Sequence, residues 1–320
     1  MPPESDERVT KMAEPTRKAE SSRRYVLSRP LSGFNDVLCQ VQRCRDYCLR
    51  HDRKMYVDST RSGLRDEFDT YFRTDDDVVL HSMPEDLWDA LDKFPAEMNR
   101  IPMDYPFRWD RALKRRVLGP PYPRVVTSFD FKKDYAERIL VHEQSGGGNL
   151  SYTALGWLRL NDWLADEIRT VLGSLPTEYS AIHVRNTDLA TDYEAFFKEI
   201  APAVGDAVVL CTDDARCAGF ARSFFGSRLL PTVEVPDYDG KPLHRVEADP
   251  ETQRRLNVMM LTDLFLMASS ESLFFTETSG IKRLSGFSQL AEYLHGAPEV
   301  RARLLTAAEG ADRRKELTTV

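Results

Sequence analysis

The stretch Ser180-Ala181-Ile182-His183-Val184-Arg185-Asn186-Thr187-Asp188 decides the fold predicted for this chain. Its apolar first half is typical of a buried parallel strand, and it leads directly into a His-x-Arg pair. Ligands of open α/β sheets gather at the carboxyl ends of strands, and a guanidinium is a permanent, planar cation that matches phosphate oxygens. His183 and Arg185 could therefore bind an anion at the strand end, or they could form an ion pair that only caps the strand. The stretch alone does not choose between these two interpretations.

Strands and helices alternate on both sides of this stretch. Short apolar runs predict strands at 25–27, 54–58, 138–141, 180–184, 207–211 and 272–276. Apolar residues at helical spacing predict helices at 37–48, 157–168, 193–200, 215–225, 258–267 and 288–294. Between 60 and 135 the pattern is less regular, with a short helix expected at 86–91 and loops at 105–124. The alternation predicts an α/β fold built on parallel sheets.

The length of 320 residues is sufficient for two domains. We expect an N-terminal Rossmann-like, acceptor-side domain at 23–150 and a C-terminal Rossmann-like, nucleotide-sugar domain at 151–308. The polar segment 1–22 is expected to be a disordered leader, and 309–320 a polar tail.

Composition narrows the functional classes. A net charge of −7 argues against a general binder of nucleic acid or anionic membranes, so any phosphate binding must be local. No apolar run approaches the roughly 20 residues of a transmembrane segment, and the N-terminus lacks a secretory signal. Five cysteines, an odd number, predict reduced thiols in a cytoplasmic protein.

Two possible metal sites have simpler interpretations. Cys44 and Cys48 continue the helical pattern that begins at Val37, and they are expected to be core thiols. The acidic triplet 75–77 is interpreted as a solvated turn, because no other ligand pattern supports a metal there. We therefore predict no metal site.

Polar residues cluster immediately after predicted strands of the second half. The clusters are His183, Arg185, Asn186 and Asp188; Thr212, Asp213 and Asp214; and Thr276, Thr278 and Ser279. Because parallel strands end at one edge of a sheet, these groups could together hold a nucleoside diphosphate. Helix capping is an equally good explanation for Asp213, Asp214 and Ser288.

The chain has no common phosphate-binding motif, neither a P-loop nor G-x-G-x-x-G. The glycine-rich segment Ser145-Gly146-Gly147-Gly148 could be a phosphate loop, a hinge or an acceptor loop.

Three segments give the chain a family resemblance. They are Ser32-Gly33-Phe34-Asn35-Asp36-Val37-Leu38, His183-Val184-Arg185-Asn186-Thr187-Asp188, and the run from the Asp263 helix through Thr278-Ser279 to Ser285-Gly286-Phe287-Ser288-Gln289-Leu290-Ala291. The pattern resembles the fucosyltransferase-like superfamily of GT-B glycosyltransferases, which includes bacterial fucosyltransferases of nodulation-factor and O-antigen synthesis and the protein O-fucosyltransferases. The resemblance implies two Rossmann-like domains that face each other across a cleft.

The resemblance also implies roles for individual residues. Arg185 would hold the donor β-phosphate, with Asn35 near the transferred sugar, Asp213 or Asp214 at the nucleoside, and Ser285 and Ser288 at the pyrophosphate. The implied donor-binding set is His183, Asn186, Asp213, Asp214, Thr278, Ser279, Ser285 and Ser288. The candidates for the base that activates the acceptor are Glu143, Asp36 and Asp188, although Asp188 could instead orient Arg185.

The predicted function is an inverting, metal-independent sugar transfer in polysaccharide biosynthesis. The donor is expected to be a nucleotide sugar, GDP-fucose, and the acceptor a glycan, with no cofactor, no nucleic-acid partner and no transmembrane segment. A catalytically inactive glycan- or nucleotide-binding protein of the same fold is the alternative. Sulfate transfer is a third possibility, disfavoured by the missing P-loop-like sequence.

Overall fold

The computed structural model describes residues 23–82, 107–110, 115–118, 126–127, 131–135, 138–187, 191–231, 248–276 and 284–307. The chain forms two compact units. Unit 1 consists of Met1–Pro30, Gln40–Asp58 and Asp76–Gln144, and unit 2 of Leu31–Cys39, Ser59–Asp75 and Ser145–Val320. The expected leader at 1–22, the tail at 309–320 and the helix at 86–91 lie outside the described residues.

Unit 1 is built on a four-stranded parallel sheet of order β4-β2-β1-β8. Its strands are β1 (Tyr25–Pro30), β2 (Lys54–Val57), β4 (Val79–Leu80) and β8 (Ile139–Gln144). In the centre of the sheet, Leu27 of β1 lies opposite Tyr56 on one side and Val141 on the other. The strands predicted at 25–27, 54–58 and 138–141 are confirmed.

Helix α2 (Phe34–His51) connects β1 to β2 and completes the predicted β-α-β unit. Val41, Cys44 and Cys48 lie on its fully buried side, at the spacing of one helix face. All five cysteines of the chain are buried thiols, as predicted for reduced cysteines, and Cys44 and Cys48 lie in the core. Burial raises the pKa of the Cys44 thiol to about 12, so this thiol stays protonated and unreactive.

The loop prediction for 105–124 is wrong in part. An antiparallel sheet in unit 1 contains β5 (Phe107–Asp110), β6 (Arg115–Leu118) and β7 (Val126–Thr127). Strand β5 alternates apolar and charged residues and β6 begins with two arginines, so neither shows a continuous apolar run of strand length. Cross-strand pairing, such as that of Phe107 with Leu118, defines these strands instead.

Unit 2 is built on a three-stranded parallel sheet of order β11-β10-β12. The strands are β10 (Ser180–Val184), β11 (Val208–Thr212) and β12 (Ser272–Phe275), close to their predicted positions. Val184 lies opposite Thr212, and the Thr276 backbone N–H donates to the His183 carbonyl over 3.1 Å. The three strands therefore end side by side, as the sequence predicts.

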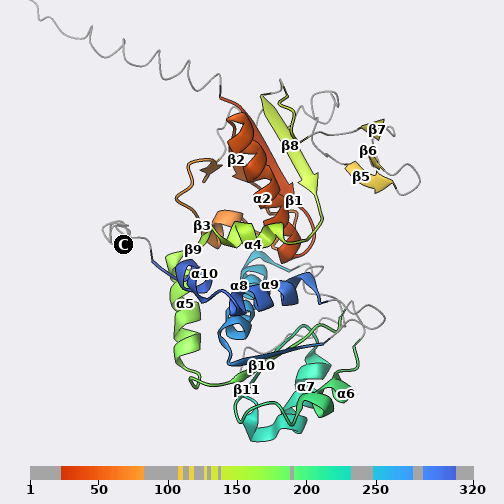
Figure 1. Ribbon diagram of the computed structural model, residues 1–320, viewed down its shortest axis with the longest axis vertical. Helices are drawn as coiled ribbons and strands as arrows, with labels where there is room; N and C mark the ends of the chain where they lie inside the picture. The colour runs from red at the N-terminus through yellow and green to blue at the C-terminus, as the bar shows by residue number, and fades with distance from the viewer. Residues whose placement is uncertain are drawn as a thin grey trace, which may run out of the picture. The chain divides into compact units, whose positions relative to one another are not determined.

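Helices cover this sheet on more than one side. Figure 1 shows α6 (Tyr193–Ile200) and α7 (Ala215–Phe225) together, and their apolar residues join Ile182, Val184 and Leu210 in one core cluster. Helix α8 (Pro250–Ser269) contacts β10 and β11, and α9 (Gly286–His295) packs on α8. The short helix α10 (Pro298–Leu304) was not predicted.

The single helix expected at 157–168 is wrong in its first part. The chain instead forms α4 (Leu150–Leu155), β9 (Arg159–Leu160) and α5 (Asp162–Gly173). Strand β9 pairs antiparallel with β3 (Phe72–Arg73), which follows a short 3₁₀ helix at Phe68–Thr70. Asn161 is extended and donates to the Thr70 carbonyl over 2.9 Å, so α5 begins only after it.

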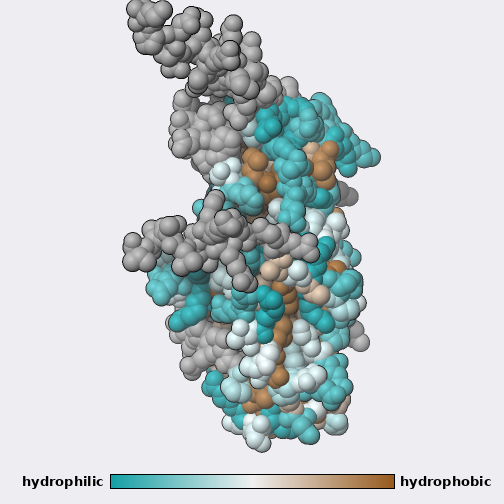
Figure 2. All heavy atoms as spheres, turned by 90° about the vertical axis from the view of Figure 1, so that its left-hand side faces the viewer, coloured by the Kyte–Doolittle hydropathy of each residue, from teal (hydrophilic) through white to brown (hydrophobic). Residues whose placement is uncertain are grey.

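The solvated turn predicted at the acidic triplet is found for Asp75 and Asp77, which are exposed, but not for Asp76, whose side chain is only 13% exposed. Asp75, Asp76 and Asp77 form ion pairs with Arg159, Arg45 and Lys54. Among the described residues no group of His, Cys, Asp and Glu is arranged to hold a metal, and no helix is both long and apolar enough to cross a membrane. The face seen in Figure 2 is largely hydrophilic or mixed, with narrow apolar areas.

Candidate functional site

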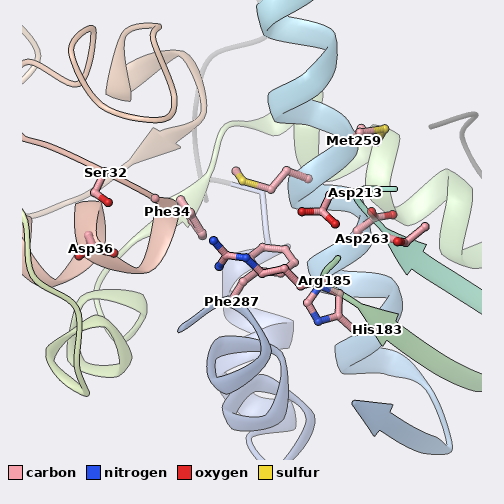
Figure 3. Close-up of a pocket in the computed structure, with 12 residues that line it drawn as sticks. Ser32, Phe34, Asp36, His183, Arg185, Asp213, Met259, Asp263 and Phe287 are labelled. Carbon is pink, nitrogen blue, oxygen red and sulfur yellow. The ribbon is translucent and has the colours of Figure 1, made fainter. Parts of the chain in front are cut away.

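A cavity of about 190 Å³ lies within unit 2, at the carboxyl ends of β10 and β11. Its walls come from the turn that opens α2, from the two strand ends, from the middle of α8 and from the start of α9. Segments separated by more than 200 residues therefore share one pocket (Figure 3).

Arg185 is the cation of this pocket. It follows β10, the central and fully buried strand of the sheet, so its side chain emerges where the strand ends. Figure 3 shows its guanidinium pointing towards Phe34 and away from Asp213 and Asp263. A rigid strand thus delivers a permanent positive charge to the cavity.

His183 lies two residues before Arg185 and is only 7% exposed. Its Nδ1 is 2.9 Å from the Ser288 hydroxyl, which is 2.8 Å from the Ser285 hydroxyl. Burial, and secondarily the charge of Arg185, lowers the His183 pKa to about 4. The imidazole is therefore neutral at physiological pH.

Ser285 and Ser288 do not line the cavity. Ser285 caps α9 by accepting a hydrogen bond from the Ser288 backbone N–H over 3.1 Å. Ser288 is 2% exposed, and its hydroxyl bridges Ser285 and His183. The two serines thus position His183, and the capping role expected as an alternative for Ser288 belongs to Ser285.

The two aspartates after β11 have different surroundings. Asp213 lines the cavity, and its carboxylate accepts from the Asn186 backbone N–H over 2.9 Å and from the Thr187 hydroxyl. Asp214 is 6% exposed and caps α7 by accepting from the Arg216 N–H over 2.8 Å. Its other oxygen accepts from the Asn186 side-chain amide over 2.6 Å. Asp214 therefore acts as a cap, and Asn186 is engaged by both aspartates.

Helix α8 contributes residues to which the sequence analysis gave no role. Met259, Met260 and Asp263 line the cavity. Burial raises the pKa of Asp263 to about 7, and a hydrogen bond from Cys211 opposes that shift only in part. Asp263 is the one charged residue between Val258 and Ala268, a stretch whose other residues are apolar apart from Thr262. A lone acid in such a stretch is the sequence feature that could have identified it.

The first turn of α2 forms the opposite wall. Ser32, Gly33, Phe34 and Asp36 line the cavity. The Gly146 backbone N–H donates to the Asp36 carboxylate over 2.8 Å, so the glycine loop after β8 rests on this turn. The loop itself does not line the cavity, which gives no support to a phosphate-cradling role.

Asn35 is buried beneath this wall rather than in it. It is 6% exposed, and a Cβ added to Gly147 or Gly286 would lie 2.7 or 2.9 Å from its Nδ2. Asn35 therefore packs closely against both glycines, between the loop and the start of α9. Its Oδ1 is buried without a hydrogen-bond partner.

The remaining candidates are not in this pocket or are not described. Glu143 lies on β8 of unit 1, 5% exposed and opposite Arg29 in the sheet register. Asp188, Thr278 and Ser279 fall outside the described residues.

Comparisons with known proteins identify the fold. No protein-family profile and no curated protein matches the sequence. The chain is similar to crystal structures of the fucosyltransferase NodZ from Bradyrhizobium (17% identity, TM-score 0.53) and of NodZ α-1,6-fucosyltransferase soaked with GDP-fucose (16% identity, TM-score 0.53), each over 85% of this chain and 93% of the other. It is also similar to a mutant of Arabidopsis thaliana FUT1 in complex with GDP, at 15% identity and TM-score 0.50, over 89% of this chain and 73% of the other. The protein therefore has the mixed α/β, GT-B-like fold of these fucosyltransferases, which confirms the predicted fold class.

Proposed function

We propose that this protein transfers fucose from GDP-fucose to a glycan acceptor with inversion and without a metal. The observation that carries the proposal is the guanidinium of Arg185, which enters a cavity at the carboxyl ends of β10 and β11. The shared fold supports it, because the similar structures include NodZ soaked with GDP-fucose and FUT1 in complex with GDP.

The leaving group is a nucleoside diphosphate, whose negative charge grows as the sugar departs. Arg185 would meet that charge, and the first turns of α2 and α9 line the cavity through Phe34 and Phe287. The amides of a helix's first turn have no partner within the helix, and they favour anions. A preorganised cation with such donors can stabilise the departing charge without a metal.

His183 supports the same anion from the strand. Because its pKa is about 4, it is neutral, and its bond to Ser288 leaves Nε2 as the ring nitrogen for a ligand. If the Ser288 hydroxyl donates to Nδ1, then Nε2 carries the proton and can donate to a phosphate oxygen. The Ser285–Ser288 pair would therefore set the tautomer that the donor requires.

The nucleoside would occupy the side of the cavity with Asp213, Asp263 and Met259. A guanine base carries adjacent N–H donors, for which carboxylate oxygens are suitable acceptors. Met259 and Met260 supply an adaptable apolar surface for the flat base. The two carboxyl groups, Asp213 and Asp263, therefore support a sugar donor whose nucleotide carries guanine.

The acceptor hydroxyl needs a base, and inversion needs no enzyme nucleophile. Of the three candidates, Asp36 has the most support, because it lines the cavity and its carboxylate is held by the Gly146 N–H. Glu143 and Asp188 remain alternative proposals for this role.

A thermal-shift series with GDP, UDP and CMP tests the donor. A ligand that binds the folded state raises its stability, so GDP should raise the melting temperature most. Fucose transfer and GDP release from GDP-fucose then test catalysis, with Arg185→Ala as the deficient variant. Preference for another nucleotide would contradict the donor, and tight GDP-fucose binding without turnover would favour an inactive binding protein.

A further inference from the structure

Ser32 has a backbone conformation that serine rarely adopts. Within the described ranges, Ser32, Asp52 and Arg65 are the non-glycine residues with positive φ, at 73°, 48° and 49°. In this region the side chain crowds its own backbone. Asp52 directly follows the last residue of α2, where helices commonly end in this conformation, and aspartate tolerates it. Neither explanation applies to Ser32.

The fold requires this turn but not a serine. The Ser32 carbonyl accepts from the Gly63 N–H over 2.7 Å, and the Gly33 carbonyl accepts from the Val37 N–H over 3.0 Å as α2 begins. Glycine would satisfy both backbone bonds without crowding. The serine therefore adds only its hydroxymethyl group, at an energetic cost.

That group lies in the cavity wall. Ser32 is exposed and lines the cavity, and Figure 3 shows it on the side of Asp36 and Phe34, across Arg185 from Asp213 and Asp263. Strained residues that the surrounding structure holds in place are concentrated at ligand sites. The strain at Ser32 is thus located where a ligand would meet its hydroxyl.

We propose that Ser32 binds the sugar of the nucleotide-sugar donor through its hydroxyl, and this inference rests on the proposed function. Nucleosides bind at strand ends, here beside Thr212 and Asp213, and the diphosphate belongs at Arg185. The remaining wall, with a hydroxyl, a carboxyl and an aromatic ring, then faces the sugar. Hydroxyl and carboxyl oxygens pair with sugar hydroxyls, and Phe34 offers an apolar surface.

Calorimetric titration of GDP and of GDP-fucose separates the sugar contact from the rest of the donor. The proteins are wild type, Ser32→Ala, Ser32→Gly and the control Asp52→Gly. Loss of one neutral hydrogen bond should weaken GDP-fucose about 5-fold in both Ser32 variants and leave GDP unchanged. Ser32→Gly and Asp52→Gly should each melt a few degrees higher through relief of strain, but Asp52→Gly should keep wild-type affinities.

The outcomes distinguish failure of the Ser32–sugar contact from failure of the proposed function. An unchanged affinity ratio of GDP-fucose to GDP in both Ser32 variants overturns the sugar contact and leaves the proposed function standing. Equal weakening of both nucleotides also overturns it, because Ser32 would then contact the nucleotide. If the wild-type protein binds neither nucleotide, the proposed function fails, and the sugar contact fails with it.

Discussion

The two units each present an arginine and an aspartate at the ends of neighbouring parallel strands, but they use them differently. In unit 1, Arg29 near the end of β1 forms an ion pair with Asp58 after β2 at 2.8 Å. In unit 2, Asp213 after β11 accepts from the Asn186 N–H and the Thr187 hydroxyl, and Arg185 after β10 enters the cavity.

The difference comes from the residues that follow the central strand. Asn186 and Thr187 bring a backbone and a side-chain donor to the carboxylate of Asp213, so that acid holds the turn. In unit 1 the next residue after Arg29 is Pro30, which has no N–H to donate. The acid next to the central strand therefore contacts the arginine in unit 1, and the turn after the strand in unit 2.

The largest expected effect separates the two arginines by function. Under the proposed function, Arg185→Ala should raise the barrier to fucose transfer by about 2–4 kcal/mol, because it would remove the cation proposed to face the leaving group. Steady-state turnover of GDP-fucose measures this loss. Arg29→Ala is the matched control, expected to change the barrier by less than about 1 kcal/mol. An equal loss of turnover in Arg185→Ala and Arg29→Ala would show that Arg185 has no special role in the reaction.

Titration at the cavity edge should give the next largest effect. Asp263, with a pKa raised from 3.8 to about 7, binds more protons when folded, so its contribution to stability is lost as the pH rises through about 7. His183, lowered from 6.5 to about 4, contributes stability that is lost as the pH falls through that window. Between pH 4 and 6.5 the two contributions oppose each other.

Asp263→Asn removes the titrating carboxyl group, so the pH dependence of stability that remains near the cavity should come from His183. Relative to wild type, the variant's free energy of unfolding should rise by roughly 2 kcal/mol between pH 4 and 7, less than the full shift implies, since the side chain is partly exposed. Urea unfolding at several pH values measures it. Parallel curves for the two proteins would show that Asp263 does not titrate as described.

The ion pair of unit 1 should matter for stability rather than for catalysis. Arg29→Ala leaves the Asp58 carboxylate with its side chain only 11% exposed, and it should lower the free energy of unfolding by about 1–2 kcal/mol. A double-mutant cycle with Asp58→Ala isolates the pair. Additive losses in urea unfolding would mean that the two residues do not interact.

The smallest effect concerns the cap that supports His183. Ser285→Ala should cost about 1 kcal/mol of stability, and Asp192→Ala, which removes the cap of α6, should cost about the same. Only Ser285→Ala should also weaken GDP binding, because Ser285 contacts Ser288, which holds His183. Similar GDP affinity in the two variants would show that the cap has no role at the site.

Local patterns predicted the parallel core well. The strand at 180–184 and the helices at 193–200 and 215–225 were placed almost residue for residue, because their apolar spacing reflects burial directly. The break at Asn161 was missed because the pairing of β9 with β3 joins residues nearly 90 apart. The hairpin strands β5 and β6 were missed because charged residues interrupt their apolar pattern.

The residues of the candidate site also fall into those that a local sequence pattern predicted and those that only long-range contacts bring to the cavity. Arg185, His183 and Asp213 could be found because strand ends of a parallel sheet meet at one edge. Asp263, Ser32 and Phe287 reach the cavity from other elements, and no local pattern brings them together. Asn35 and Ser288, which were expected at the ligand, are 6% and 2% exposed and do not line the cavity, and their roles stay predictions.

The sequence by itself determined the alternation of strands and helices and the polar strand ends, because hydrophobic periodicity is a local property. Only the tertiary structure decided which side chains line the cavity, because that depends on contacts between distant segments of the chain. Arg29 and Arg185 both stand at strand ends in the sequence, whereas the contacts of the neighbouring aspartates, Asp58 with Arg29 and Asp213 with Asn186 and Thr187, join different strands of each sheet.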